Sequence, residues 1–245
     1  MTTVKDQGHC GSCYANAATA QIESAAAIAS GLLFDLSLEQ GAFCTENPHS
    51  CGGTGGCAGG TAEVVFDAVA KSGGMFESFQ YPYSGYYGND SACALPTTVS
   101  PKVSITGYTK LPENEYAPLM QAVATEGPIA ISVDASVWHA YHSGIFSGCD
   151  QQNPDIDHAV LLAGYGFEPN GQKYWLVRNS WSASWGEAGF IRLSREDQEE
   201  ILCGIDKTPE DGSACTGETD PVKVCGTCGI LFDTSYVTGA DIVAQ

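Results

Sequence analysis

The stretch that decides the fold of this chain is Gln7-Gly-His-Cys10-Gly-Ser-Cys13-Tyr14-Ala15. An alanine-rich segment with apolar residues at helical spacing follows it, so Cys13 should occupy the first turn of a helix. The positive end of the helix dipole favours an ionised thiol at that position, whereas Cys10 lies one loop earlier. We therefore predict that Cys13 is a reactive thiol and that Cys10 is free to form a disulfide.

A different interpretation treats the same cysteines as a metal or redox motif. Cys10 and Cys13 have Cys-x-x-Cys spacing, which recurs in Cys225-Gly-Thr-Cys228. Two such pairs can form a four-cysteine zinc site. This hypothesis leaves the histidine and asparagine motifs further along the chain unexplained. We therefore expect no metal and no other cofactor.

Two further motifs carry polar side chains at the ends of apolar runs. His158 opens a run that ends in Gly-Tyr-Gly, and the next run leads into Asn179-Ser-Trp181-Ser-Ala-Ser-Trp185. Taken alone, such a histidine is usually structural, such an asparagine belongs to a turn, and the tryptophans pack in a core. The order Cys13, His158, Asn179 favours chemistry instead. The amide oxygen can accept from one imidazole nitrogen and turn the other toward the thiol.

Helical periodicity dominates the first half of the chain, and short apolar runs bounded by Gly, Asn or Ser dominate the second. The expected helices are Tyr14–Ser30, a short helix opened by Ser37-Leu-Glu-Gln40, Thr61–Ser72 and one near Glu115–Glu126. The expected strands are Ile129–Val133, Ala159–Tyr165, Tyr174–Arg178 and Phe190–Leu193. Residues 50–60 should be irregular backbone pinned by disulfides, and residues 206–222 an exposed loop. A helical block followed by a strand block predicts an α+β, two-lobed architecture.

Composition limits the partners and the compartment. With 245 residues, 43% of them hydrophobic, the chain can fold as one domain or as two lobes around a cleft. Its 29 acidic and 10 basic residues make nucleic acid and anionic membranes poor partners, and they favour acidic or saline surroundings. Eleven cysteines indicate an oxidising compartment, and their odd number leaves at least one thiol unpaired.

Together these motifs resemble those of the papain family of cysteine proteases, over nearly the whole chain from Val4 to Val237. The resemblance includes four more motifs, namely Gly52-Gly-Thr-Gly-Gly-Cys57-Ala-Gly-Gly60, Tyr81-Pro-Tyr83, Gly127-Pro128 and Cys228-Gly-Ile…Ser235-Tyr236. It implies a papain-like α+β fold with a mainly helical lobe, residues 1–105, that carries Cys13. A β-barrel-like lobe, residues 106–245, would carry His158 and Asn179, with the active-site cleft between the lobes.

The resemblance also assigns roles to the residues around the cleft. Cys13 and His158 would form a thiolate–imidazolium pair that Asn179 orients. The Gln7 side-chain amide and the Cys13 backbone N–H would stabilise the negative charge that develops on the substrate's carbonyl oxygen. The first tryptophan after Asn179 would shield the hydrogen bond to His158 from water, and the second would line the leaving-group side.

The resemblance further implies a disulfide pattern and an insertion. The implied disulfides are Cys10–Cys57, Cys44–Cys93 and Cys149–Cys228. Residues from about 197 to 224 are then an insertion relative to papain. The remaining cysteines, Cys51, Cys203, Cys215 and Cys225, suffice for two more disulfides, and the sequence leaves all three pairings open. We expect these disulfides to brace an exposed loop.

Substrate choice follows from the same resemblance. Asp233 would form the floor of the pocket for the side chain two residues upstream of the cut. The pocket walls would be Thr61, Ala62, Ser132, Ile156 and Ala159. The other predicted substrate-binding residues are Gly59, Gly60, Asp157, Trp181 and Trp185. A small, mostly apolar pocket should take aliphatic or aromatic side chains, and also arginine if the floor carboxylate faces it. In the alternative, Asp233 points to solvent.

Two functions of different class remain open at this point. The favoured one is a cysteine endopeptidase that acts on polypeptides as a monomer, with its own propeptide and cystatin-like inhibitors as further partners. We expect no nucleic acid or membrane partner, and a lysosomal, vacuolar or secreted location. The rival is a non-catalytic binding or storage protein on the same fold, which would be expected to lack one of the catalytic residues.

Overall fold

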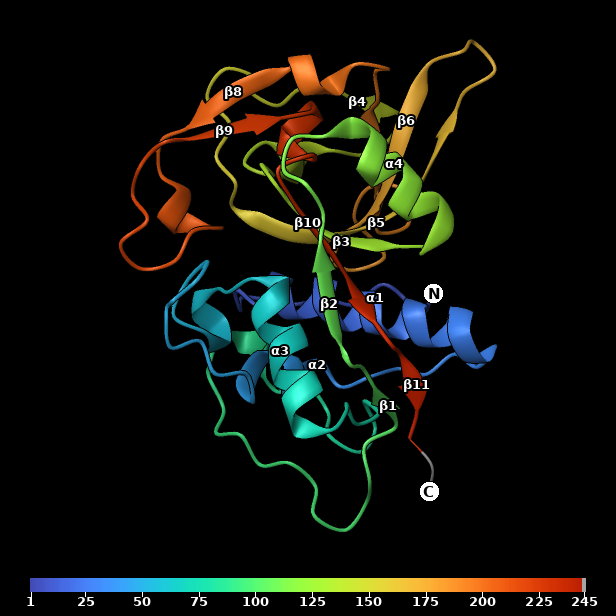
Figure 1. The fold of residues 1–245 in the computed structure, drawn as a ribbon, viewed down its shortest axis with the longest axis vertical. Coiled ribbons are helices and arrows are strands. Elements are labelled where there is room, and N and C mark those ends of the chain that lie inside the picture. Colours follow the sequence, from blue (N-terminus) through green and yellow to red (C-terminus); the bar gives the residue numbers. More distant parts are fainter. Residues whose placement is uncertain (244–245) are drawn as a thin grey trace.

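The computed structural model describes residues 1–243, which form a helical lobe and a β lobe that meet along one boundary (Figure 1). The α-helices are α1 (Cys13–Ser30), α2 (Leu38–Phe43), α3 (Ala62–Ser72) and α4 (Tyr116–Thr125). The strands are β1 (Val103–Ser104), β2 (Gly107–Lys110), β3 (Ile129–Val133), β4 (Ile145–Phe146), β5 (His158–Phe167), β6 (Lys173–Arg178), β7 (Phe190–Ser194), β8 (Cys203–Asp206), β9 (Val222–Cys225), β10 (Asp233–Thr238) and β11 (Asp241–Ile242). This arrangement confirms the predicted α+β fold class. Across residues 1–243, no helix is both long and apolar enough to cross a bilayer.

The long helix α1 is the centre of the helical lobe and begins at Cys13. Its many alanines favour the helix and let α2 and α3 pack closely against it. Gly31 ends α1 in the left-handed conformation, with φ of 74°, and its N–H donates to the carbonyl of Ala27. Ser37 caps α2 by accepting from the Gln40 N–H at 3.1 Å, as the capping-box spacing predicts.

A seven-stranded sheet in the order β2-β10-β3-β5-β6-β7-β4 is the framework of the β lobe. Strand β5 lies between β3 and β6 and is antiparallel to both, with His158 opposite Val133. The core on this sheet includes Trp138 and Trp175, whose side chains are fully buried. Helix α1 packs against β5, and this contact between the lobes brings the start of α1 to the start of β5.

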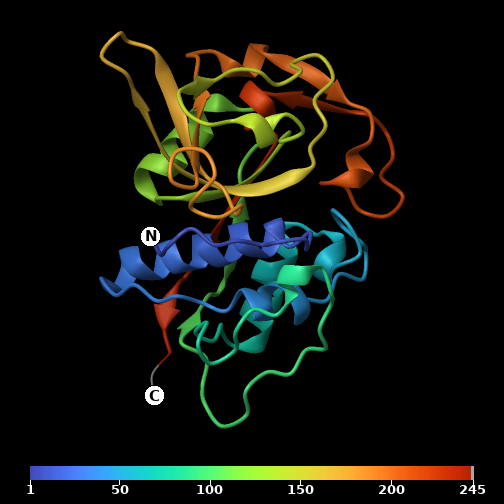
Figure 2. The ribbon, with the colours of Figure 1, turned by 180° about the vertical axis from the view of Figure 1, so that it is seen from behind.

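Both ends of the chain cross the boundary between the lobes. The N-terminal segment runs along the β lobe, where the Gln7 N–H donates to the Ser180 carbonyl at 2.9 Å. It is also attached to α1, because the Lys5 Nζ lies 2.7 Å from the buried carboxylate of Glu23. At the other end, β11 pairs with β1 beside the helical lobe (Figure 2).

The predicted insertion forms a hairpin with a long connection. Strands β8 and β9 are antiparallel, with Cys203 opposite Cys225 and Asp206 opposite Val222. The connection between them, residues 207–221, leaves the β lobe and approaches the helical lobe in both views (Figures 1 and 2). We call this connection the strap. The segment predicted as an exposed loop therefore starts and ends in strands, and its middle is partly covered by the other lobe.

Candidate active site

The position of Cys13 follows from the start of α1. It is the first residue of the helix, its side chain is partly exposed, and it carries the free thiol among residues 1–243. Backbone N–H groups of Ala159, Tyr14 and Cys13 itself point toward the sulfur. The thiol therefore lies where helix α1 meets the first residues of β5, within reach of groups that stabilise negative charge.

His158 and Asn179 meet across neighbouring strands. His158 is the first residue of β5, and Asn179 directly follows β6. The His158 Nε2 lies 2.8 Å from Asn179 Oδ1. Because an amide oxygen only accepts, Nε2 carries the proton and Nδ1 remains available to the thiol side. Asn179 Oδ1 also accepts from the Ser180 N–H at 2.8 Å, which holds the amide in this orientation.

Burial pushes the thiol and the imidazole toward their neutral forms. Desolvation raises the pKa of the Cys13 thiol, while the N–H groups of Ala159 and Tyr14 lower this pKa. Desolvation lowers the pKa of His158, while the hydrogen bond to Asn179 raises it. These hydrogen bonds offset part of the free-energy cost of ionising Cys13 and His158. The attraction between the thiolate and the imidazolium must offset the remainder of that cost.

Asp157 adds a carboxylate next to His158. Its Oδ1 accepts from the Ala135 N–H at 2.8 Å. Desolvation, together with the neighbouring Asp134 and Asp155, raises the pKa of Asp157 to about 6. An ionised Asp157 raises the pKa of both Cys13 and His158. In acidic surroundings Asp157 is protonated, so it no longer raises the Cys13 pKa and no longer opposes formation of the thiolate.

An aromatic cluster covers the histidine. The Trp181 ring stacks on His158 and on His139, with 4.8 Å between centroids in each pair. Trp185 meets Trp181 edge-on at 5.3 Å, and the fully buried Trp138 meets His158 edge-on at 6.3 Å. No sequence motif marks Trp138 and His139 as site residues, because they follow β3 in a segment without any recognisable pattern.

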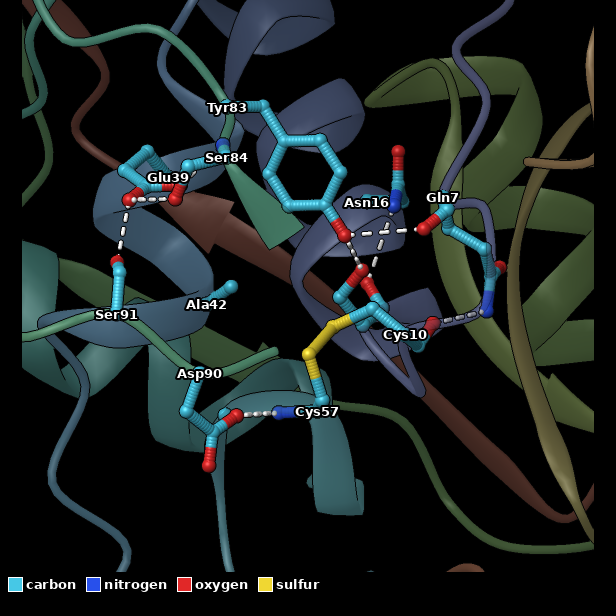
Figure 3. Close-up of a disulfide and its surroundings, with 12 residues drawn as sticks. Gln7, Cys10, Asn16, Glu39, Ala42, Cys57, Tyr83, Ser84, Asp90 and Ser91 are labelled. Atoms are coloured by element: carbon cyan, nitrogen blue, oxygen red, sulfur yellow. Dashed lines mark hydrogen bonds between the residues drawn. A yellow bond between two sulfur atoms is a disulfide. The ribbon is translucent and has the colours of Figure 1, made fainter. Parts of the chain in front are cut away.

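Gln7 lies beside the thiol's loop with its side-chain amide fixed (Figure 3). Its Nε2 donates to the Cys10 carbonyl at 2.9 Å, and its Oε1 accepts from the Ser180 hydroxyl. An amide nitrogen has two hydrogens, so the second remains available to an incoming oxygen. Tyr83 supports the same loop, because its hydroxyl donates to the Gln7 carbonyl at 3.0 Å and lies 2.8 Å from the Ser12 hydroxyl.

Tyr14 and Asn16 are polar residues in the first turns of α1, and both are buried. The buried Tyr14 donates its hydroxyl toward the carbonyls of Ala42 and Gly56, at 3.1 and 3.2 Å. Asn16 Nδ2 donates to the Ser12 carbonyl at 3.1 Å. Both residues therefore tie the first turns of α1 to its surroundings through hydrogen bonds.

The disulfides account for the other ten cysteines. The structure contains Cys10–Cys57, Cys44–Cys93, Cys51–Cys215, Cys149–Cys228 and Cys203–Cys225. Three of these are the pairs that the papain resemblance implies, and the other two select one of the pairings left open for the insertion. The zinc hypothesis fails, because three of its four cysteines form disulfides with residues outside the motif.

The carboxylate of Asp233 is buried and already has partners. Its Oδ2 accepts from the Ser132 hydroxyl at 2.6 Å, and Lys110 Nζ lies 3.0 Å from its Oδ1. Only 6% of Asp233 is exposed, so it does not point freely to solvent. Burial and the nearby Asp233 raise the pKa of the adjacent Glu63, and Lys110 lowers that pKa. Lys110 Nζ also lies 3.7 Å from a carboxylate oxygen of Glu113.

Two of the remaining predicted pocket residues lie beside Asp233 on neighbouring strands. Ser132 and Ala159 face each other on β3 and β5, and Asp233 is opposite Ser132 on β10. Predicted pocket residues that are buried are Gly60, Thr61, Ala62, Ser132, Ile156 and Ala159, and Gly59 is partly exposed. Ile156 is fully buried and packs beside Gly229.

Comparisons with known proteins agree with this geometry. A family model described as papain family cysteine protease matches residues 1–211. The senescence-specific cysteine protease SAG12 of Arabidopsis thaliana is 36% identical over 208 residues, which cover 84% of this chain and 57% of that protein. Cathepsin L of Sarcophaga peregrina is 37% identical over 209 residues, which cover 84% and 58%. The chain thus spans little more than half the length of these curated relatives.

Solved structures extend the similarity to almost the whole chain. The bromelain protease of Ananas comosus, in complex with the E64 inhibitor, has a TM-score of 0.74 and 34% identity, over 97% of this chain and 93% of that one. A recombinant stem bromelain precursor has the same TM-score and identity, over 97% and 66%. The family match, the sequence identity and the shared fold all point to one conclusion: this chain belongs to the papain family of cysteine proteases.

Proposed function

We propose that this chain is the catalytic domain of a cysteine endopeptidase, with Cys13 as nucleophile, His158 as its acid and base, and Asn179 as the residue that orients the imidazole. The observation that carries the proposal is the 2.8 Å contact between His158 Nε2 and Asn179 Oδ1, at two strand ends next to the free thiol. Every residue type that the chemistry needs is present. That favours an enzyme over a non-catalytic binding or storage protein.

The first half of the reaction forms an acyl-enzyme. The Cys13 thiolate attacks the scissile carbonyl carbon, and the carbonyl π electrons move to the oxygen. When the tetrahedral intermediate collapses, the C–N bond breaks and the leaving amine takes the proton from the His158 imidazolium. The product is a thioester on Cys13 and a neutral His158.

The second half releases the acid. The neutral His158 takes a proton from water, and the hydroxide that forms attacks the thioester carbon. The C–S bond then breaks, which restores the thiolate and the imidazolium. In both halves the free Gln7 amide hydrogen and the Cys13 N–H would stabilise the oxyanion, and losing one such donor typically costs roughly 3 kcal/mol.

The specificity pocket should favour uncharged side chains. The partners of Asp233 support this proposal, because Lys110 already balances the carboxylate that the sequence suggests as a partner for arginine. An arginine would have to compete with this ammonium group for the same oxygen atoms. We therefore propose that the position two residues upstream of the cut takes aliphatic or aromatic side chains in preference to arginine.

Replacing Lys110 with methionine tests this preference. The variant Lys110→Met keeps the aliphatic stem and removes the charge, so the Asp233 carboxylate loses its ammonium partner. The ratio of kcat/KM for arginine over leucine at the upstream position should rise about tenfold, which corresponds to about 1.4 kcal/mol. Fluorogenic peptides that differ only at that position give the ratio, and Lys71→Met, an exposed lysine of α3, is the control. An unchanged ratio in Lys110→Met would mean that Asp233 does not reach the pocket.

The surroundings of the protein belong to the same proposal. Five disulfides support an oxidising compartment such as a lysosome, a vacuole or the extracellular space. The net charge of −19 also suits acidic surroundings, where self-repulsion falls. The expected partners of the protein are polypeptide substrates, a propeptide and cystatin-like inhibitors.

Titration with an epoxide-type thiol inhibitor tests the proposed function. One equivalent per chain should bind, peptide mapping should find the label on Cys13, and peptidase activity should disappear in proportion. Cys13→Ala, the matched control, should take up no label. A folded protein with intact disulfides that neither binds the inhibitor nor cleaves peptides would support the non-catalytic binding protein instead.

A further inference from the structure

The base of the strap is fixed directly beside the candidate active site. Asp206, the last residue of β8, is fully buried, and its Oδ2 accepts from the Ile156 N–H at 3.2 Å. Its Oδ1 accepts from the Thr208 N–H at 2.9 Å, which turns the chain into the strap. Because Ile156 lies two residues before His158, the strap begins next to the predicted substrate site.

The far part of the strap is bound to the helical lobe. Cys215 of the strap forms a disulfide with Cys51, in the glycine-rich loop before α3. Two backbone hydrogen bonds flank this disulfide: the Gly52 N–H donates to the Ala214 carbonyl at 2.9 Å, and the Thr216 N–H donates to the His49 carbonyl at 2.8 Å. The strap therefore forms a covalent bridge between the two lobes.

Between these two attachments the strap lies directly on the backbone of both lobes. A Cβ on Gly212 would overlap the carbonyl oxygen of Ile156 and lie 3.1 Å from the Cα of Asp157. On the other side, a Cβ on Gly52 would lie 2.7 Å from the Gly212 carbonyl oxygen and 2.8 Å from that of Gly60. Only glycine fits such close approaches, and no space for a peptide remains beneath the strap at this point.

The strap also lines a cavity beside Asp233, the residue predicted as the floor of the specificity pocket. A cavity of about 420 Å³ is lined by Lys110, Phe232 and Asp233 of the β lobe and by Ser213 and Ala214 of the strap, among others. Together with the close approach of Gly212 to Ile156, and of Gly52 to the Gly212 and Gly60 carbonyls, this places the strap along the predicted substrate-binding residues of both lobes. A longer substrate would have to continue through the place that the strap occupies.

We propose that the strap closes the upstream end of the substrate site, so that the tied enzyme accepts no more than about two residues before the scissile bond. This inference rests on the proposed cysteine-peptidase chemistry and narrows the proposed function, because it assigns endopeptidase activity to the released form and restricts the tied form to short upstream segments. In the tied form the bond cut lies close to the amino end of a substrate. Internal bonds of longer chains become accessible when the strap is released from the helical lobe.

A peptide series that varies only in upstream length tests the inference. All peptides carry leucine two residues before the cut, the same leaving group and an acetylated amino end, with none, one, two or four alanines added upstream. For the native protein, kcat/KM should fall at least tenfold when the first alanine is added. The reductant is kept low enough to preserve the disulfides, which is verified from the mass after alkylation.

Two variants release the strap in different ways. Cys51→Ala with Cys215→Ala removes the bridge, and this double variant should cleave the extended peptides about as well as the shortest one. The second variant replaces residues 207–221 with Asn-Gly and carries Cys51→Ala, because Asp206 and Val222 are opposite each other and a two-residue turn can join them. It should show the same gain.

The control and the outcomes separate the possible failures. Cys44→Ala with Cys93→Ala removes a disulfide that lies within the helical lobe, and this control should keep the length dependence of the native protein.

Equal cleavage of short and extended peptides by the native protein would overturn the inference, even if no variant folds. The inference would also be overturned if the native protein and the released variants showed the same dependence of kcat/KM on peptide length. If no protein cleaves the shortest peptide or binds a thiol inhibitor, the proposed function fails, and the inference fails with it.

Discussion

Cys13→Ser is expected to lower kcat at least about 10⁴-fold while the protein remains folded. Serine is almost isosteric with cysteine, but an alcohol gives up its proton far less readily than a thiol. The base is also weak, because burial lowers the pKa of His158 and its partner Asn179 is a neutral amide rather than a carboxylate. The site therefore matches a thiol nucleophile and should not activate a hydroxyl.

The measurement can be controlled within the same protein. Ten of the eleven cysteines form disulfides, so the unfolded, unreduced native protein should contain one titratable thiol and Cys13→Ser none. Kinetics with a short fluorogenic peptide then measure kcat for both proteins. Residual activity within tenfold of the native value would show that a different group attacks the substrate.

The second large effect is a loss of stability as the pH rises, caused by Glu199. This side chain is fully buried in the insertion, where its two carboxylate oxygens each lie 3.0 Å from the Trp175 Nε1. The Glu196 N–H donates to it as well, at 2.9 Å. Despite these donors, burial raises the pKa of Glu199 to about 7, against an ordinary value of 4.5.

The direction of the pH effect on stability depends on whether the folded or the unfolded chain holds the Glu199 proton. Below pH 4.5 both the folded and the unfolded chain keep the Glu199 carboxyl protonated, so its contribution to stability is fully present. As the pH rises from 4.5 to about 7, the unfolded chain loses the proton and the folded chain retains it, so the free energy of unfolding falls. A difference of about 2.5 pKa units corresponds to about 3 kcal/mol, of which about 2.5 kcal/mol should be lost between about pH 5 and pH 8.

Urea denaturation at these two pH values measures the effect. Between these two pH values, the free energy of unfolding of Glu199→Gln should change by about 2 to 3 kcal/mol less than that of the native protein, because glutamine can accept from Trp175 without titrating. Glu200→Gln, at the exposed neighbouring position, is the control and should leave the pH dependence unchanged. If Glu199→Gln retains the full dependence, the carboxyl of Glu199 does not hold its proton at neutral pH.

Local patterns were sufficient wherever neighbours in sequence set the conformation. The strand Ile129–Val133 has the predicted bounds, each predicted helix begins within one or two residues of its place in the structure, and the three helices with a predicted end also end there within one residue. Helix and strand periodicity, a cap such as Ser37 and a stop such as Gly31 act over a few residues, so the sequence reveals them directly. The positions of Cys13, His158 and Asn179 at element ends follow from the same local rules.

Interactions between distant residues could not be predicted in this way. Lys110 and Asp233 are far apart in sequence and meet because β10 pairs with both β2 and β3. Trp138 covers His158 although nothing in its own segment marks it as part of the site. Such contacts depend on the packing of whole strands, which a pattern within one strand does not specify.

Local sequence patterns alone place a thiol at a helix start, a histidine at a strand start and an asparagine at a strand end, on an α+β framework. The pairing of Cys51 with Cys215 depends on the tertiary structure: this disulfide ties the insertion to the helical lobe, while Cys203–Cys225 braces the hairpin at the base of the insertion. The physical reason is that the entropy of closing a long loop changes only slowly with its length, so spacing cannot choose among the pairings. The choice comes from which backbones can approach, as Gly52 and Gly212 allow here.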